Sequence, residues 1–449
     1  MKYIYLLIFI YIVGCTESPS KKYDFVISNV HLIDGTGNAL KSNVNVYIKD
    51  GRIALMDKTE VSKKETIIDG TDKYLMPGLF DCHAHTGTFQ IDFPKFIHFG
   101  VTSIFVPGGS TCTNEYYKEM REIGKQDSIP APRVFHTSQH FIMEGSHPVR
   151  TYASSNWEDG KTVFYLNDTL QIESLVKEVS QYDIQGIKLT IEDGPMPPPI
   201  PRMPQEFINK VVKEAEKNNT KVFVHISDNI ELRMALEAGI NNFIHFTGVN
   251  LDFQNDREMI EDIYQSDVSW VTTLMIDKSF IYPLHPEWVS QTEIINIYSA
   301  EERFSNLTSE SEIEKAKKYL SFFETDYGLK DPTLESIMSF QVEDIKTLFE
   351  NGVNMVLGTD AGNTYNFHGH SLHEEMQLLE LGGMKPMDII KMGTYNAAKM
   401  MDTLDELGTI EQGKIADMVL LDKNPLESIK NTLSINTVFK NGIIQQRIE

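Results

Sequence analysis

The sequence predicts an α/β fold, a (β/α)8 TIM barrel with a small β-sandwich domain formed by both ends of the chain. Three observations lead to this prediction. Short apolar runs alternate with segments of helical periodicity in the middle of the chain, both ends carry short β-rich runs, and 449 residues suffice for more than one structural unit. The expected boundaries are 77–407 for the barrel, and 23–76 plus 408–449 for the sandwich.

The N-terminal residues are expected to lie outside this fold, because they resemble an export signal. Lys2 precedes an apolar run, Tyr3–Val13, that is too short to span a bilayer as a helix but suits a secretory signal. The run ends in Ile12-Val13-Gly14-Cys15, which resembles the lipobox of bacterial lipoproteins. We expect a signal peptide over 1–15, lipidation of Cys15 and a tether over 16–22. The chain would then be exported and held, by its lipid alone, on the periplasmic or cell-surface side of a bacterial membrane. A plain secretory peptide with an incidental cysteine is the alternative.

The net charge of the chain indicates which binding partners are unfavourable. The chain has 41 Lys and Arg residues against 64 Asp and Glu residues, a formal net charge of −23. Such an excess of negative charge argues against a nucleic-acid or anionic-membrane binding face.

The two ends of the chain have the same sequence pattern, short β-rich runs separated by turns. Between Asp24 and Asp69, short β-rich runs alternate with turn signals such as Asp34-Gly35-Thr36-Gly37. Similar runs, at Ala416–Leu421 and Val438–Gly442, recur near the C-terminus. Two β-rich ends that flank a long middle are expected to pair into one sandwich.

The middle of the chain predicts eight strands that alternate with helices, and a parallel barrel is the natural closure of that pattern. One helical face is typical of the connecting segments: Phe207, Ile208, Val211, Val212 and Ala215. The expected strands are Leu79–His85, Val101–Val106, Arg133–Thr137, Gly186–Thr190, Lys221–Ile226, Asn242–Phe246, Val268–Leu274 and Asn354–Thr359.

Two stretches interrupt this rhythm. Pro195–Pro204 contains six prolines and is expected to form a stiff loop after the fourth strand. Met275–Phe340 is too long for a simple connection and carries charged helical segments, so we expect an insertion over about 275–340 that acts as a lid.

Side chains that can bind a metal occur at the ends of five predicted strands. His83-Ala84-His85 places two imidazoles on one face of the first strand, and imidazole is a natural ligand for zinc. The remaining candidates are Lys188 in the fourth strand, His225 in the fifth, His245 in the sixth and Asp360 after the eighth. Singly, a histidine in an apolar run is more often a core residue, whereas a buried lysine is costly as packing. Because active sites of such barrels lie at the carboxyl ends of the strands, we expect all six side chains to converge.

Seven motifs follow one another along the chain between Asp24 and Gly442. They are Ile33–Gly37, Met76–His85, Gly100–Ser103, Ile187-Lys188, Leu357–Gly362, Ser371–Glu375 and, most specifically, Gly408–Asp417. In this order they resemble the amidohydrolase superfamily, in its imidazolonepropionase-like and Xaa-Pro dipeptidase-like (prolidase-type) branch.

This resemblance implies a site for two divalent metal ions, usually zinc. It assigns His83, His85 and Asp360 to the first metal, His225 and His245 to the second, and a carboxylated Lys188 to both. Carboxylation is physically reasonable, because a carbamate turns a buried cation into an anionic oxygen ligand. The family mechanism implies a metal-bridging hydroxide that attacks an amide, while Asp360 takes its proton and passes it to the departing amine. The expected substrate is a small amide, such as a dipeptide or N-acyl amino acid.

Two alternatives stay open. A cyclic-amide hydrolase similar to imidazolonepropionase would use one metal and would not need Lys188. A non-catalytic anchored binding protein would have kept the barrel alone, although binding does not require the general base that Asp360 would supply.

Substrate contacts are the least constrained part of the prediction. His140 and His147 after the third strand, and His368 after the eighth, are candidate substrate contacts. Arg150 and Arg202 are candidate partners for a substrate carboxylate, although a solvated surface position is the commoner fate of an arginine. The chain also departs from the family where Ser227-Asp228 follows His225 and where Ile244, in place of a glutamate, precedes His245. We expect both departures to alter the surroundings of the ligands or the substrate pocket.

Overall fold

A parallel eight-stranded sheet forms the centre of the molecule in the computed structural model, which describes residues 22–194, 200–246, 248–326 and 328–448. Its strands follow the order β14-β13-β12-β11-β10-β8-β7-β6, and a short strand, β9 (Val163–Tyr165), pairs with β8. The eight strands are β6 (Leu79–Asp81), β7 (Val101–Val106), β8 (Arg133–Ile142), β10 (Gly186–Thr190), β11 (Lys221–His225), β12 (Asn242–Phe243), β13 (Ser269–Val271) and β14 (Asn354–Val356). The predicted signal peptide, Cys15 and residues 195–199 of the proline-rich loop lie outside the described residues.

Backbone hydrogen bonds join the first strand to the last and close the sheet. Cys82 N donates to Leu357 O at 3.0 Å, and Asp360 N donates to His83 O at 2.8 Å. A further bridge pairs Ala84 with Ala361. The predicted α/β barrel is therefore confirmed.

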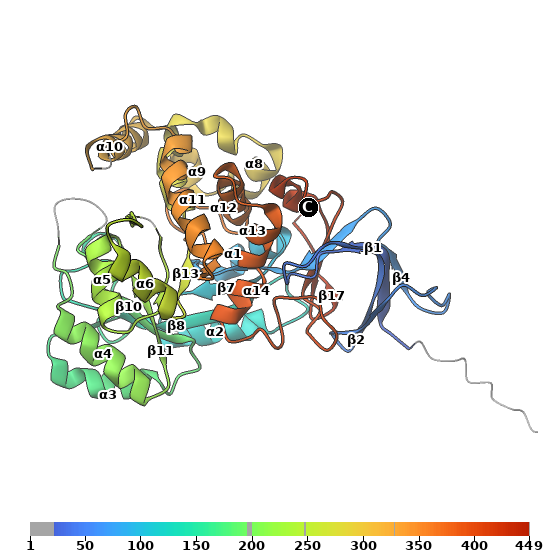
Figure 1. Ribbon diagram of the computed structural model, residues 1–449, viewed down its shortest axis with the longest axis horizontal. Helices are drawn as coiled ribbons and strands as arrows, with labels where there is room; N and C mark the ends of the chain where they lie inside the picture. The colour runs from blue at the N-terminus through green and yellow to red at the C-terminus, as the bar shows by residue number, and fades with distance from the viewer. Residues whose placement is uncertain (1–21, 195–199, 247, 327, 449) are drawn as a thin grey trace, which may run out of the picture.

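Helices surround the barrel (Figure 1). In α4, the apolar positions that predicted a single face, Phe207 to Ala215, are indeed buried. The helices of the barrel are α1 (Phe89–His98), α2 (Asn114–Gly124), α3 (Thr169–Val179), α4 (Gln205–Lys217), α5 (Asn229–Glu237), α6 (Arg257–Gln265), α11 (Leu334–Glu350), α12 (His370–Leu381), α13 (Pro386–Met392) and α14 (Tyr395–Met400). Within the described residues, no helix combines the length and the apolar composition that a bilayer crossing requires.

Several strands are shorter than the sequence predicted. The residues that lie beyond their ends include candidate metal ligands. β6 ends at Asp81, before His83 and His85, and β14 ends at Val356, before Asp360. Asp360 adopts a left-handed backbone conformation, with φ of 62°, which aspartate tolerates better than most residues. The ligand candidates thus lie just beyond the regular ladder, where the backbone can turn their side chains inward.

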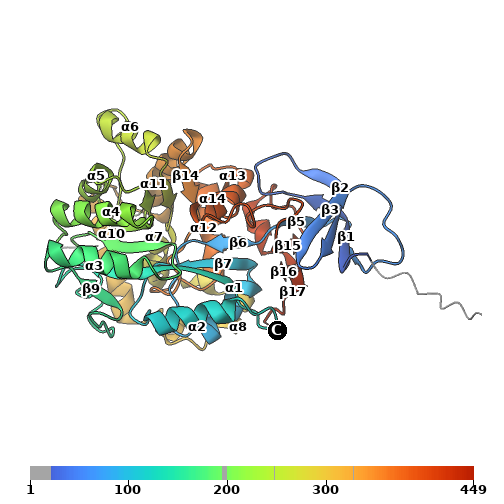
Figure 2. The same cartoon turned by 90° about the horizontal axis from the view of Figure 1, so that it is seen from below.

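Both ends of the chain contribute to one second sheet, which lies at one side of the barrel (Figure 2). The order is β17-β16-β15-β5-β1-β2-β3, with β4 on β1; the pairings of β1 with β4 and with β5 are parallel and the rest antiparallel. Phe25 and Phe439, from opposite ends of the sequence, stack in its core at 5.4 Å between ring centroids. The strands are β1 (Phe25–Leu32), β2 (Lys41–Lys49), β3 (Arg52–Asp57), β4 (Ile67–Asp69), β5 (Tyr74–Pro77), β15 (Met418–Leu421), β16 (Ile435–Lys440) and β17 (Ile443–Ile444).

The long segment between β13 and β14 is helical and packs over one end of the barrel (Figure 1). It comprises α7 (Met275–Ile281), two short 3-10 helices (Tyr282–Leu284 and Pro286–Val289), α8 (Thr292–Tyr298), α9 (Glu302–Asn306) and α10 (Glu310–Asp326). α7 and α10 contribute side chains to the wall of the cavity that contains the candidate site.

Candidate metal centre

A cavity of about 610 Å³ opens at the carboxyl ends of the strands. All six predicted metal ligands line it: His83, His85, Lys188, His225, His245 and Asp360. They follow or belong to five different strands, so the convergence that barrel geometry predicts is present.

His83 and His85 direct their Nε2 atoms toward each other and toward the Asp360 carboxylate. His83 Nδ1 lies 2.8 Å from the carbonyl oxygen of Ile244, and His85 Nδ1 lies 2.8 Å from that of Gly108. A carbonyl only accepts, so both rings are protonated at Nδ1 and carry a lone pair at Nε2. Yet the two Nε2 atoms lie 3.3 Å apart, and Asp360 Oδ1 lies 3.0 Å from that of His85. Two lone pairs and a carboxylate oxygen with no proton between them fit a divalent cation.

Asp360 is positioned as an anion. Its side chain is buried; Oδ2 accepts a 2.6 Å hydrogen bond from Asn363 Nδ2, whereas Oδ1 has no hydrogen-bond partner among the described residues. Burial alone would raise the pKa of Asp360, but positive charge at the adjacent His83 and His85 holds it well below its usual range; with both rings neutral, a bound cation would supply that charge. Burial also keeps the pKa of His83 well below its usual range, so this imidazole is neutral and can act as a ligand.

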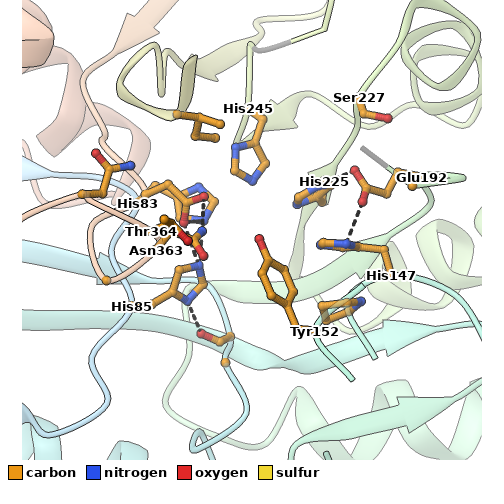
Figure 3. A pocket seen from close by; sticks show the side chains of 18 of the residues that line it. His83, His85, His147, Tyr152, Glu192, His225, Ser227, His245, Asn363 and Thr364 are labelled. Carbon is orange, nitrogen blue, oxygen red and sulfur yellow. Dashed lines mark hydrogen bonds and ion pairs between the residues drawn. The ribbon is translucent and has the colours of Figure 1, made fainter. Parts of the chain in front are cut away.

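Glu192 orients the histidine of the fifth strand. His225 Nε2 lies 2.6 Å from Glu192 Oε2, and His147 Nδ1 lies 2.8 Å from Glu192 Oε1 (Figure 3). Burial alone would raise the pKa of Glu192, but the two imidazoles hold it far below its usual range, so it accepts the His225 Nε2 proton. His225 therefore keeps its lone pair on Nδ1, the arrangement in which a carboxylate fixes the tautomer of a metal-binding histidine.

His245 and Lys188 complete the inner surface of the cavity. The ring of His245 lies 4.3 Å from that of His83 and 4.2 Å from that of His225, measured between centroids. Its Nδ1 contacts Thr273 Oγ1 at 3.2 Å. Lys188 is 1% exposed, and burial lowers its pKa to about 7, so a large share of this amine is neutral at physiological pH.

Of the predicted substrate contacts, two line the cavity and one does not. His140 faces the cavity with an Nε2 atom that has no hydrogen-bond partner in the described chain, and His147 lies beside Glu192. His368 is instead buried behind the site, where its Nε2 lies 2.8 Å from the carbonyl oxygen of His85. It supports the backbone of a candidate ligand and does not line the cavity.

Sequence reasoning missed Glu192 and Tyr152. Glu192 could have been found, because Lys188, Thr190 and Glu192 are spaced by two and so face the same side of an extended strand. Tyr152 lies in a loop whose composition gives no such signal. Its ring is 40% exposed, and its hydroxyl points between His83 and His225 (Figure 3).

The arginines considered for a substrate carboxylate are placed elsewhere. Arg202 Nη2 lies 2.8 Å from Asp193 and 2.7 Å from Asp228, while Nε lies 3.1 Å from Glu231. These three carboxylates lie close enough together to hold a metal ion, but the guanidinium already supplies their positive charge. Arg150 is exposed and does not line the cavity. Arg202 is therefore committed to carboxylates of the protein, and Arg150 lies at the surface, which is the alternative that the sequence left open for both.

Comparisons with known proteins give the family and the fold of the chain. A family model described as "Amidohydrolase family" matches residues 74–444. The chain is 23% identical to ochratoxinase from Aspergillus niger over 92% of this chain and 84% of that enzyme. It is 36% identical to imidazolonepropionase from Caldanaerobacter subterraneus subsp. tengcongensis over 24% of this chain and 26% of that enzyme. A solved Xaa-Pro dipeptidase with bound methionine has the same fold, with a TM-score of 0.70, 21% identity, and coverage of 94% of this chain and 99% of that one.

Proposed function

The chain belongs to the amidohydrolase family, and from this premise we propose that it is a metal-dependent hydrolase that cleaves the C–N amide bond of a small substrate. The observation that carries the proposal is the set of proton-free ligand atoms: Nε2 of His83, Nε2 of His85 and Oδ1 of Asp360. Ochratoxinase and the Xaa-Pro dipeptidase are hydrolases by name and cover nearly the whole chain, which supports the reaction class.

The donor set suits two divalent ions, most simply zinc. His83, His85 and Asp360 would hold one, and His225 through Nδ1 with His245 would hold the other. When bound, two such ions supply a water molecule acidic enough to act as a nucleophile at neutral pH and a Lewis acid for the substrate carbonyl. Lys188 would contribute to both after its neutral amine adds to carbon dioxide, a step that forms a carbamate and releases one proton. Its lowered pKa favours that step, because only the unprotonated amine is nucleophilic.

Asp360 would move the proton that the reaction requires. Its Oδ1 is held toward the cavity by the Asn363 hydrogen bond to Oδ2, and its charge is retained at neutral pH. It would accept a proton from the attacking water and deliver it to the amide nitrogen as the C–N bond breaks, releasing a carboxylic acid and an amine. Tyr152 and His140 line the cavity and would orient the substrate during this transfer.

Metal content and two substitutions test this proposal together. We expect about two zinc ions per chain, a loss of about 10²–10⁴ in kcat for Asp360→Asn with amide substrates, and a similar loss for Lys188→Ala. Full activity with about one metal per chain and an unimpaired Lys188→Ala variant would instead favour the mononuclear, imidazolonepropionase-like reaction. Unchanged turnover in Asp360→Asn would contradict the assigned proton transfer.

We further propose that the protein is exported and lipid-anchored through Cys15. The support is the apolar run followed by Ile12-Val13-Gly14-Cys15, which the described residues do not include. Expression in a bacterial host with labelled fatty acid should label the wild type and leave Cys15→Ser unlabelled. Equal labelling, or recovery of the wild type in the soluble fraction, would contradict the anchor.

A further inference from the structure

The cavity wall outside the candidate metal ligands is acidic. Four carboxylates line it: Glu192, Asp193, Asp228 and Asp277. Among the described lining residues there is no arginine, and the only lysine is Lys188, which belongs to the ligand set. The internal residues outside the description, 195–199, 247 and 327, are proline, methionine, threonine and tyrosine, so by sequence they add no cation.

Among the described residues, the arginine that pairs with this acidic wall, Arg202, already has three carboxylate partners. The Arg202 guanidinium contacts Asp193, Asp228 and Glu231, so three carboxylates share one positive charge. Glu231 is fully buried and also accepts hydrogen bonds from the backbone N–H groups of Asp193 and Ser227. Away from the proposed metal ions, a substrate carboxylate would have to displace one of these groups or lie unpaired beside them, and both alternatives are unfavourable in a partly dehydrated cavity.

The inserted segment gives the same cavity an aromatic wall. Phe280 at the end of α7 lies 4.7 Å from Tyr319 of α10, and Tyr319 lies 5.4 Å from Phe323, measured between ring centroids. All three line the cavity, and Phe280 is 37% exposed. Asp277, on the same helix as Phe280, is bound by the Tyr319 hydroxyl and by Gln341 Nε2 at 2.8 Å, which ties α7 to α10 and α11. The wall is therefore a fixed apolar surface of the kind that contacts aromatic groups.

We infer that the cavity selects amides that carry an aromatic or bulky apolar group and no carboxylate. The inference rests on the proposed hydrolase function and narrows it, because free dipeptides and N-acyl amino acids would be poor substrates. The acidic wall opposes a carboxylate, and the Phe280–Tyr319–Phe323 surface binds an apolar group.

A matched set of three amides tests the inference. N-benzoyl-L-phenylalaninamide is neutral and aromatic, N-benzoyl-L-phenylalanine differs from it by the carboxylate, and N-acetylglycinamide lacks the aromatic groups. We expect the zinc-loaded full chain to bind and hydrolyse the first with at least tenfold greater affinity and kcat/KM than either of the others. Binding is measured by calorimetry and hydrolysis by chromatography of the released acid, in parallel.

Two readouts separate this inference from the proposed function. Equal or tighter binding of the free acid, or of N-acetylglycinamide, would overturn the selectivity whether or not turnover occurs. The expected binding order without hydrolysis of any amide would uphold the selectivity and contradict the hydrolase function instead.

Two substitutions in the inserted segment complete the test. Phe280→Ala should raise the KM for the neutral aromatic amide at least fivefold and leave the KM for N-acetylglycinamide within twofold. Ile295→Ala is the control, because Ile295 lies in α8 of the same insertion, is 40% exposed and does not line the cavity. An unchanged KM in Phe280→Ala, or an equal change in Ile295→Ala, would overturn the assigned aromatic surface.

Discussion

Glu192→Gln is the substitution that examines the candidate site most directly, because it changes a charge without removing a metal ligand. Glu192 receives His225 Nε2 at 2.6 Å and faces His147 Nδ1 at 2.8 Å, one imidazole on each oxygen. A glutamine has one oxygen and one NH2 group. Whichever way its amide turns, one histidine loses an acceptor and the other keeps a neutral one.

The expected size of the effect follows from those two contacts. Hydrogen bonds to charged groups contribute about 1.5–3 kcal/mol, whereas neutral ones contribute about 0.5–1.5 kcal/mol. The substitution weakens one of these bonds by about 1 kcal/mol and removes the other, so the preference for the His225 tautomer with a free Nδ1 is weakened or lost. We therefore expect about a 10- to 100-fold loss of affinity at the site of His225 and His245, and a comparable fall in kcat/KM.

The assay is zinc competition against a chelator, combined with hydrolysis of an amide substrate. The site of His83, His85 and Asp360 should keep its affinity for zinc. The binding of the two zinc ions should therefore separate into two steps of different affinity. Glu173→Gln is the matched control, because Glu173 is 69% exposed on α3 and remote from the cavity. Two equivalent zinc sites and activity within twofold of the wild type would refute the role assigned to Glu192. A matching loss in Glu173→Gln would show a nonspecific effect of the assay.

Three further predictions concern the support of the site and the stability of the fold. Gly108→Ala should lower the free energy of unfolding by about 1–3 kcal/mol and activity at least tenfold, because φ of Gly108 is +106° and the added Cβ would lie 2.2 Å from His140 Nε2. Gly413→Ala is the control for backbone strain alone, because φ of Gly413 is +94° and its added Cβ would meet nothing within 4 Å. Equal losses of activity in the two variants would contradict the clash with His140. Arg202→Gln should lower the free energy of unfolding by about 1–3 kcal/mol in urea denaturation, because it leaves Asp193, Asp228 and Glu231 without their shared cation; an unchanged midpoint would show that the cluster contributes nothing. Burial raises the pKa of Asp344 from 3.8 to about 6, so folding takes up a proton between these pH values and the free energy of unfolding falls as pH rises from about 4 to 6. Asp344→Asn should remove about 1–3 kcal/mol of that fall. Identical pH profiles of urea unfolding in the variant and the wild type would contradict this prediction.

The barrel could be predicted because its signals are local and repeated. Each apolar run marks a strand through its own composition, and helices such as α4 show their buried face through spacing alone. Alternation of the two then leaves few topologies to consider. The convergence of the candidate metal ligands could be predicted for the same reason, because strand ends in a barrel converge whatever the loops do.

The surroundings of the ligands could not be predicted in the same way, since they depend on contacts between segments far apart in the sequence. His368 is 283 residues from the His85 carbonyl that it contacts, and no periodicity links them. Arg202 was a reasonable partner for a substrate by residue type, yet three carboxylates from two loops and one helix neutralise it. A side chain's type states what it can bind, whereas only the fold states what is close enough to be bound.

The segment that carries Lys188 was predictable only in part. Its alternating residues place both a candidate ligand and a residue that supports another candidate ligand. Lys188 and Glu192 line the cavity, the first as a candidate ligand and the second as the partner of His225, while Thr190 between them contacts His140 Nδ1 at 3.1 Å. A single-residue insertion or deletion between Lys188 and Glu192 would turn one end of this set to the opposite face of the strand. It would thereby separate the amine that is proposed to bind carbon dioxide from the carboxylate that orients His225. Alternation over five residues is thus what places the proposed bridging ligand and the carboxylate that supports its neighbour on one wall of the cavity.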